Sequence, residues 1–133
     1  MFVTSALLAT GALVFVSAAV QHLNTVGSKG LAFVFTDRAT PLSRDGFAGR
    51  AARTLQNSLE SAGMAVPALA ILAMLDVSNV VVLAAALAYS IARVGFVVSY
   101  WAGASRLRSF FWGVGMAMIA ILSVNAGLAV LAA

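Results

Sequence analysis

The sequence contains no cysteine, which excludes disulfide bonds, thiolate metal sites and a cysteine nucleophile. Any thiol chemistry therefore requires a thiol from another molecule. Histidine is almost absent too, since His22 is the only one. Without a cluster of carboxylates around it, His22 is expected to pack at a helix end, and no metal is predicted.

Charged residues are also scarce, because they make up 9% of the 133 residues and only four of them are acidic. A typical soluble domain has about 25% charged residues, so this chain cannot cover a water-soluble globule with polar surface. The basic residues give a net charge of +4. They lie in loops and at helix ends rather than in a stripe with interleaved aromatic residues, so no nucleic-acid partner is expected.

Hydrophobic residues make up 62% of the chain, which is typical of an integral membrane protein. A helix needs about 20 apolar residues to span a bilayer, so this length fits one all-α domain of four transmembrane helices, over residues 1–133. The apolar runs and the polar breaks between them predict helices at about residues 2–23, 48–75, 79–101 and 106–131. Ser105 is predicted to cap the last of these helices.

The distribution of basic residues predicts the orientation of the bundle in the membrane. The first loop contains Lys29, Arg38 and Arg44, with Arg50 beside it, and the third contains Arg106 and Arg108. The second loop and both tails contain none. Short loops rich in Lys and Arg remain cytoplasmic, so both termini are expected to face away from the cytoplasm.

Polar side chains form two stripes on neighbouring helices. At about 100° per residue, the stripe on the second helix covers an arc of roughly 80° and that on the third covers roughly 60°. The first stripe consists of Arg50, Arg53, Asn57 and Glu60, and the second of Tyr89, Arg93, Phe96 and Tyr100. Charges at this depth are costly, so a function or a structural lock is expected for them.

Counting from the cytoplasmic ends of the two helices aligns the stripes by depth. The rise of about 1.5 Å per residue sets Arg53 level with Tyr100, Asn57 with Phe96, and Glu60 with Arg93. The last pair lies roughly 18 Å from the cytoplasmic ends, near the middle of the membrane. We therefore hypothesise an ion pair between Glu60 and Arg93.

One interpretation is that these groups only lock the two helices together. Arginine exceeds carboxylate in the stripes, however, and a net-positive cleft open to the cytoplasm favours a small anionic ligand with carboxylates. Arg106 and Arg108 lie in the first turn of the fourth helix, where free backbone N–H groups also attract negative charge. The alternative for this pair is a role in topology and contact with lipid headgroups.

The spacing Arg-x-x-Arg-x-x-x-Asn-x-x-Glu at residues 50–60 resembles the signature of the MAPEG family, membrane-associated proteins in eicosanoid and glutathione metabolism. Arg93 and Tyr100 on the third helix agree with this resemblance, as does Ser-Arg-Leu-Arg at 105–108 before Phe-Phe-Trp-Gly at 110–113. The resemblance covers essentially the whole chain. It implies a homotrimer of four-helix protomers that binds glutathione, and no metal, between subunits near the cytoplasmic surface.

The resemblance also assigns residues to the glutathione site. Arg53, Asn57 and Glu60 would bind the tripeptide with Arg50 at the edge of the site, and the third helix would add Arg93 and Tyr100. The catalytic arginine that stabilises the thiolate matches Arg108, with Arg106 as the alternative. Lipophilic electrophiles would enter from the bilayer and react with this thiolate, as in a glutathione S-transferase or peroxidase that serves detoxification.

Two positions depart from the better-known eukaryotic members, because Ser61 and Phe96 stand where several of them have tyrosine. These differences argue against a dedicated leukotriene or prostaglandin synthase. The compact chain resembles bacterial members, which implies a multi-pass protein of a bacterial inner membrane.

Two other functions remain open at this point. A small four-helix multidrug transporter would use Glu60 to couple protons to cationic drugs, although arginines crowd that carboxylate. A non-catalytic membrane scaffold with the MAPEG-like fold would show no thiol turnover.

Overall fold

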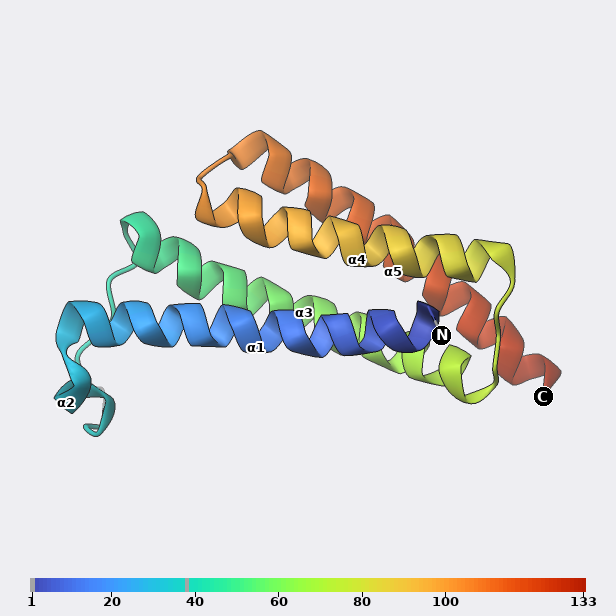
Figure 1. Ribbon diagram of the computed structural model, residues 1–133, viewed down its shortest axis with the longest axis horizontal. Coiled ribbons are helices and arrows are strands. Elements are labelled where there is room, and N and C mark those ends of the chain that lie inside the picture. The colour runs from blue at the N-terminus through green and yellow to red at the C-terminus, as the bar shows by residue number, and fades with distance from the viewer. Residues whose placement is uncertain (1, 38) are drawn as a thin grey trace.

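A computed structural model describes residues 2–37 and 39–133 of the chain. Arg38, one of the basic residues behind the predicted orientation, lies outside the described residues. The helices are α1 (Phe2–Lys29), α2 (Leu31–Val34), α3 (Gly46–Met74), α4 (Val80–Trp101) and α5 (Ser105–Ala132). The four long ones are apolar enough to cross a membrane, which confirms the predicted all-α fold with four spanning helices. They alternate in direction along one elongated bundle (Figure 1).

Two predicted helix ends differ from the structure. The first helix does not stop near Leu23 but continues to Lys29. Backbone hydrogen bonding continues through this polar end, where the Gly30 N–H donates to the Val26 carbonyl oxygen at 2.8 Å. Ser105 is not a cap, because α5 already begins there and Ala104 occupies the N-cap position without a side-chain hydrogen bond.

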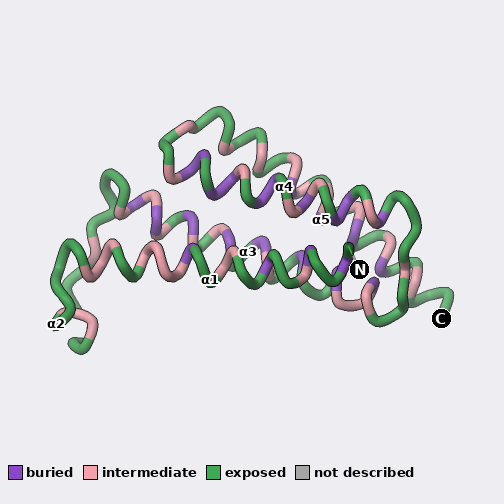
Figure 2. Tube along the Cα trace, in the orientation of Figure 1, coloured by how far each residue is buried: buried purple, intermediate pink, exposed green. Residues whose placement is uncertain are grey.

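The most extensive helix contacts join α1 to α3 and α4 to α5, and α3 also packs against α5. Buried residues gather on the sides of α3 and α4 that face the other helices, while much of the outer surface is exposed (Figure 2). Leu8 and Phe15 on α1 are 76% and 73% exposed, as suits residues that contact lipid. Many of the buried residues are small, which lets membrane helices approach closely: Ala65, Ala68, Ala85, Ala86, Ala92 and Ala126.

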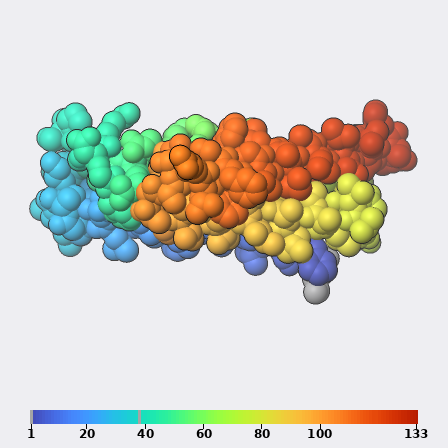
Figure 3. Space-filling model, turned by 90° about the horizontal axis from the view of Figure 1, so that it is seen from above, coloured from blue at the N-terminus to red at the C-terminus, as the bar shows by residue number. Residues whose placement is uncertain are grey.

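The contact between α4 and α5 depends on one glycine. A Cβ added at Gly95 would come within 2.7 Å of the Phe111 ring, which is too close for a real contact. The missing side chain therefore lets Phe111 lie directly on the α4 backbone. Figure 3 shows α5 along the length of the bundle, with its C-terminal part extending beyond the neighbouring helices.

The α4–α5 pair diverges from the α1–α3 pair toward the end where α4 turns into α5 (Figure 1). Gly103 makes this turn with a φ of 77°, a left-handed conformation that glycine adopts without strain. The beginning of α3 lies at the same end, so the first turns of α3 and α5 and the last turns of α4 surround the candidate site.

Candidate functional site

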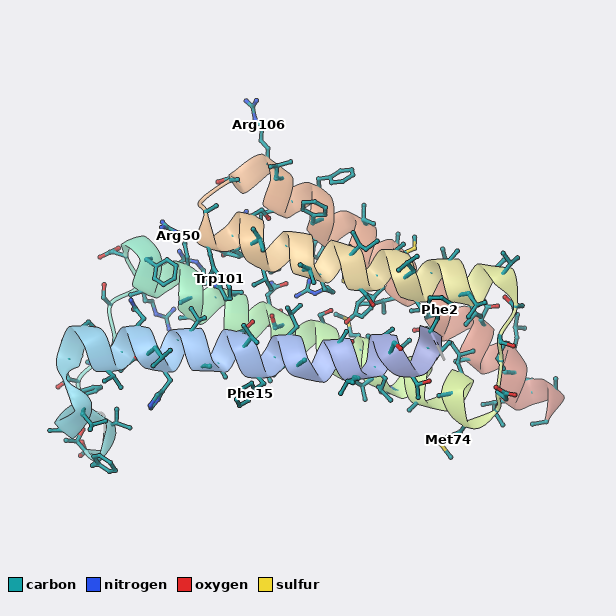
Figure 4. The ribbon with its side chains drawn as sticks, in the orientation of Figure 1. Phe2, Phe15, Arg50, Met74, Trp101 and Arg106 are labelled. Atoms are coloured by element: carbon teal, nitrogen blue, oxygen red, sulfur yellow. The ribbon has the colours of Figure 1, made fainter. Side chains whose placement is uncertain are left out.

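Two arginines of α3 contact the last residues of α4. Arg53 donates a hydrogen bond from Nε to the Tyr100 hydroxyl at 3.1 Å, so this part of the depth alignment is confirmed. One turn earlier, Arg50 donates from Nε to the carbonyl oxygen of Trp101 at 3.2 Å. Figure 4 shows Arg50 and Trp101 next to each other at this end of the bundle. Each contact joins a guanidinium group of α3 to the end of α4, although Arg50 is half-buried and Arg53 exposed.

Tyr100 is the central residue of the site, because side chains from three helices contact it. The guanidinium carbon of Arg108 on α5 lies 4.8 Å from the centre of the Tyr100 ring, a cation–π distance. The Phe96 and Tyr100 rings form a T-shaped pair with a centroid distance of 5.4 Å. Arg106 is exposed and points away from the bundle (Figure 4). The structure thus brings Arg108, and not Arg106, to Tyr100 of the α4 stripe.

Two neighbouring clefts meet at Tyr100 and Arg108. The first has a volume of about 250 Å³ and is lined by Gly46, Arg50, Arg53, Ser99, Tyr100, Gly103, Ala104, Ser105 and Arg108. The second has about 280 Å³ and is lined by Asn57, Phe96, Tyr100, Arg108, Ser109 and Trp112. Neither set of lining residues includes Asp or Glu. Three arginines, together with the free N–H groups at the start of α5, give the first cleft a positive electrostatic potential.

The predicted ion pair between Glu60 and Arg93 is wrong within the protomer. Arg93 is only 4% exposed, donates from Nη2 to the Asn57 carbonyl oxygen at 3.2 Å, and stacks on the Phe96 ring at 4.4 Å. Glu60 is exposed on the outer face of α3, where its Oε1 accepts a hydrogen bond from Gln56 at 2.9 Å. Arg93 on α4 is therefore directed at the α3 backbone inside the bundle, whereas the Glu60 side chain lies on the exposed face of α3.

Two other members of the stripes, Tyr89 and Phe96, are buried in the core. Tyr89 is buried, and its hydroxyl lies 3.1 Å from the hydroxyl of Ser61. Ser61 therefore faces α4 inside the bundle. Phe96 is almost fully buried between Arg93 and Tyr100, although it reaches the wall of the second cleft.

Sequence reasoning missed several lining residues. Trp112 follows Arg108 by four residues, so helical spacing would have placed it on the same face, whereas Ser109, one residue after Arg108, carries no such signal. It also missed a larger groove of about 630 Å³ that shares Arg53 with the first cleft. This groove is lined by Gln21, Pro41, Leu42, Ser43, Arg44, Gly49, Ala52, Arg53, Leu55, Gln56 and Leu59.

Comparison with known proteins agrees with the fold and with the motif. The model of the MAPEG family matches residues 1–128 of the chain. The chain belongs to the MAPEG family. The members of this family are membrane proteins linked to glutathione, and they include glutathione transferases and peroxidases. Searches of curated proteins and of solved structures found no match.

Three of the four motif residues line the two clefts of this MAPEG protein. The motif residues Arg50 and Arg53 line the first cleft, and Asn57 lines the second. Glu60 lies one turn deeper on the outer face of α3. Planar guanidinium groups bind carboxylates through paired hydrogen bonds, so the arrangement is suited to a small ligand with more than one carboxylate.

Proposed function

We propose that this MAPEG protein is a membrane-embedded, glutathione-dependent transferase or peroxidase. The observation that supports this function is the cleft between α3, α4 and α5, which is lined by Arg50, Arg53 and Arg108 and by no carboxylate. The two adjoining clefts together fall within the range of about 300–1,000 Å³ that small-molecule sites occupy. Glutathione has two carboxylates and a thiol, so it matches both the charge and the size.

The arginines of α3 would bind the peptide part of glutathione. Arg53 is already fixed by Tyr100, and Arg50 by the Trp101 carbonyl, so each guanidinium has further N–H groups for a carboxylate. Asn57 would donate an amide hydrogen bond from the second cleft. Arg93 is too buried for direct contact, and we assign it a supporting role through the Asn57 carbonyl and the Phe96 ring.

Arg108 would act on the thiol of glutathione. Its guanidinium lies over the Tyr100 ring, where both clefts meet, and a positive charge beside the sulfur favours the thiolate over the thiol. In the transferase reaction the thiolate attacks an electrophilic carbon. A sulfur–carbon bond forms, and the leaving group departs with its electron pair. Lipophilic electrophiles concentrate in the bilayer, so they would reach Arg108 from the membrane side.

The outer face of α3 supports a homotrimer with the glutathione site at the contact between subunits. Gln56 and Glu60 are both exposed there in a single protomer. A carboxylate near the bilayer centre costs at least about 2.5 kcal/mol when lipid surrounds it, so a polar cover from a second copy is favoured. At such a contact Glu60 would be available to the cationic amine of glutathione. A proton-coupled transporter would instead require this carboxylate inside the bundle.

The proposal is tested with purified protein in detergent or nanodiscs. Calorimetric titration with glutathione should show saturable binding, and the enzyme should conjugate glutathione to a generic aryl halide above the uncatalysed rate. The control ligand is a glutathione analogue with both carboxylates esterified, which should bind much more weakly than glutathione. If glutathione does not bind at millimolar concentration, the proposed function is wrong.

A further inference from the structure

The segment between α2 and α3 rests directly on the α3 backbone at Gly49. Gly49 is buried, and its backbone N–H donates to the Asp45 carbonyl oxygen at 3.1 Å. A Cβ added at this position would overlap the carbonyl oxygen and carbon of Arg44 and would lie 3.1 Å from its Cα. These are backbone atoms, so a side chain at position 49 cannot be accommodated by a rotamer change and must displace the segment.

The Arg44 carbonyl that rests on Gly49 also holds a residue of the site. Arg53 donates to it from Nη1 at 3.3 Å, and the same guanidinium group donates from Nε to Tyr100 at 3.1 Å. Arg53 is thus held between the connecting segment on one side and α4 on the other. An arginine side chain has many rotamers, so fixing it before the ligand arrives reduces the entropic cost of binding.

We propose that Gly49 is a positioning residue for Arg53. Because Gly49 lacks a side chain, the Arg44 carbonyl can approach α3 closely enough to accept the hydrogen bond that orients the Arg53 guanidinium. The inference rests on the proposed function, since it assigns Arg53 to ligand binding. A change at Gly49 should therefore affect the binding of glutathione and not the chemical step. Arg108, the residue proposed to act on the thiol, contacts the Tyr100 ring and has no described contact with this segment.

The main test compares Gly49→Ala with Gly127→Ala, a control on α5 where an added Cβ meets nothing within 4 Å. We expect the KM for glutathione to rise about tenfold in Gly49→Ala, the effect of losing one hydrogen bond to a charged group, with kcat unchanged. Gly127→Ala should retain both parameters. A Gly49→Ala enzyme with the KM of the parent, or one that loses kcat to the same extent, would overturn the proposal.

A second variant shows whether Gly49 acts through Arg53. In an Arg53→Ala background, Gly49→Ala should cause no further rise in the glutathione KM, because the group that it positions is gone. If the two effects instead multiply, Gly49 acts by another route and the proposal is wrong.

A third measurement needs neither glutathione nor a folded Gly49→Ala protein. Limited trypsin digestion of the otherwise intact chain should cleave after Arg44 several-fold faster in Arg53→Ala than in the parent, since the Arg44 carbonyl loses its donor. Arg50→Ala is the control, because Arg50 donates to Trp101 instead. Unchanged cleavage after Arg44 in Arg53→Ala would refute the positioning role. Failure of glutathione to bind the parent protein, with trypsin behaving as expected, would refute only the proposed function.

Discussion

Replacing Tyr100 by Phe removes one oxygen atom from the centre of the site and leaves the aromatic ring in place. The lost hydroxyl is the acceptor for Arg53 Nε at 3.1 Å. The ring contacts with Arg108 and Phe96 do not use the hydroxyl, so both should persist in the variant. The substitution therefore tests whether the orientation of Arg53 contributes to ligand binding.

The expected magnitude follows from the hydrogen bonds that Arg53 makes. A hydrogen bond to a charged group contributes about 1.5–3 kcal/mol. Arg53 keeps its second bond to the Arg44 carbonyl at 3.3 Å, so the lower end of that range applies. A loss of about 1.5 kcal/mol corresponds to a Kd for glutathione that is about tenfold higher. Isothermal titration calorimetry of the detergent-solubilised protein measures this change directly.

Tyr89→Phe is the matched control, because it is the same substitution on the same helix. The Tyr89 hydroxyl is buried and lies 3.1 Å from Ser61, away from both clefts. Its removal should lower the stability of the protein by about 1 kcal/mol without changing the glutathione Kd. If Tyr100→Phe binds glutathione as the parent does, or if Tyr89→Phe weakens binding equally, the proposed role of Arg53 is refuted.

Three further predictions concern the thiol, the helix contact and the carboxylate. Arg108→Ala removes the charge that we propose lowers the pKa of the bound glutathione thiol, so the rising limb of kcat/KM against pH should move up by about one pH unit; an unmoved limb contradicts this role. Gly95→Ala forces a methyl group against the Phe111 ring and should cost about 1–3 kcal/mol in thermal unfolding, whereas Gly113→Ala, where an added Cβ meets nothing within 4 Å, should be nearly neutral. Glu60→Gln should weaken glutathione binding but change protomer stability by less than about 0.5 kcal/mol, because Arg93 bonds to the Asn57 carbonyl and not to Glu60. Strong destabilisation would show that the Glu60 and Arg93 side chains are paired after all.

The fold could be predicted from the sequence because apolar runs of spanning length report directly on membrane helices. The end of α1 was the exception. Residues 24–29 include Asn24, Thr25, Ser28 and Lys29, whose polarity predicts a loop, yet the helix continues to Lys29 because helical backbone bonds form equally well where polar side chains meet water. Hydropathy therefore locates the apolar part of a spanning helix better than its ends.

The candidate site was only partly predictable, because the depth of a residue in a helix does not determine the direction of its side chain. The alignment correctly paired Arg53 with Tyr100. It failed about two turns deeper, where Arg93 donates to the Asn57 carbonyl oxygen and Glu60 instead accepts a hydrogen bond from Gln56 on the outer face. An arginine side chain can donate to a backbone carbonyl as easily as to a carboxylate, and residue spacing does not tell which acceptor it uses. The contact of the segment at Gly49 involves backbone atoms that no sequence motif marks.

The measurement that tests the central claim most directly is the ultraviolet difference spectrum of glutathione bound to the purified protein near neutral pH. The thiol group of free glutathione is mostly protonated under these conditions. If the arginine-lined cleft binds and activates glutathione, a saturable thiolate absorbance should appear on titration and should disappear when S-methylglutathione replaces glutathione. Saturable binding without any thiolate absorbance, or no binding at all, would contradict the assignment of this site as a glutathione-activating centre.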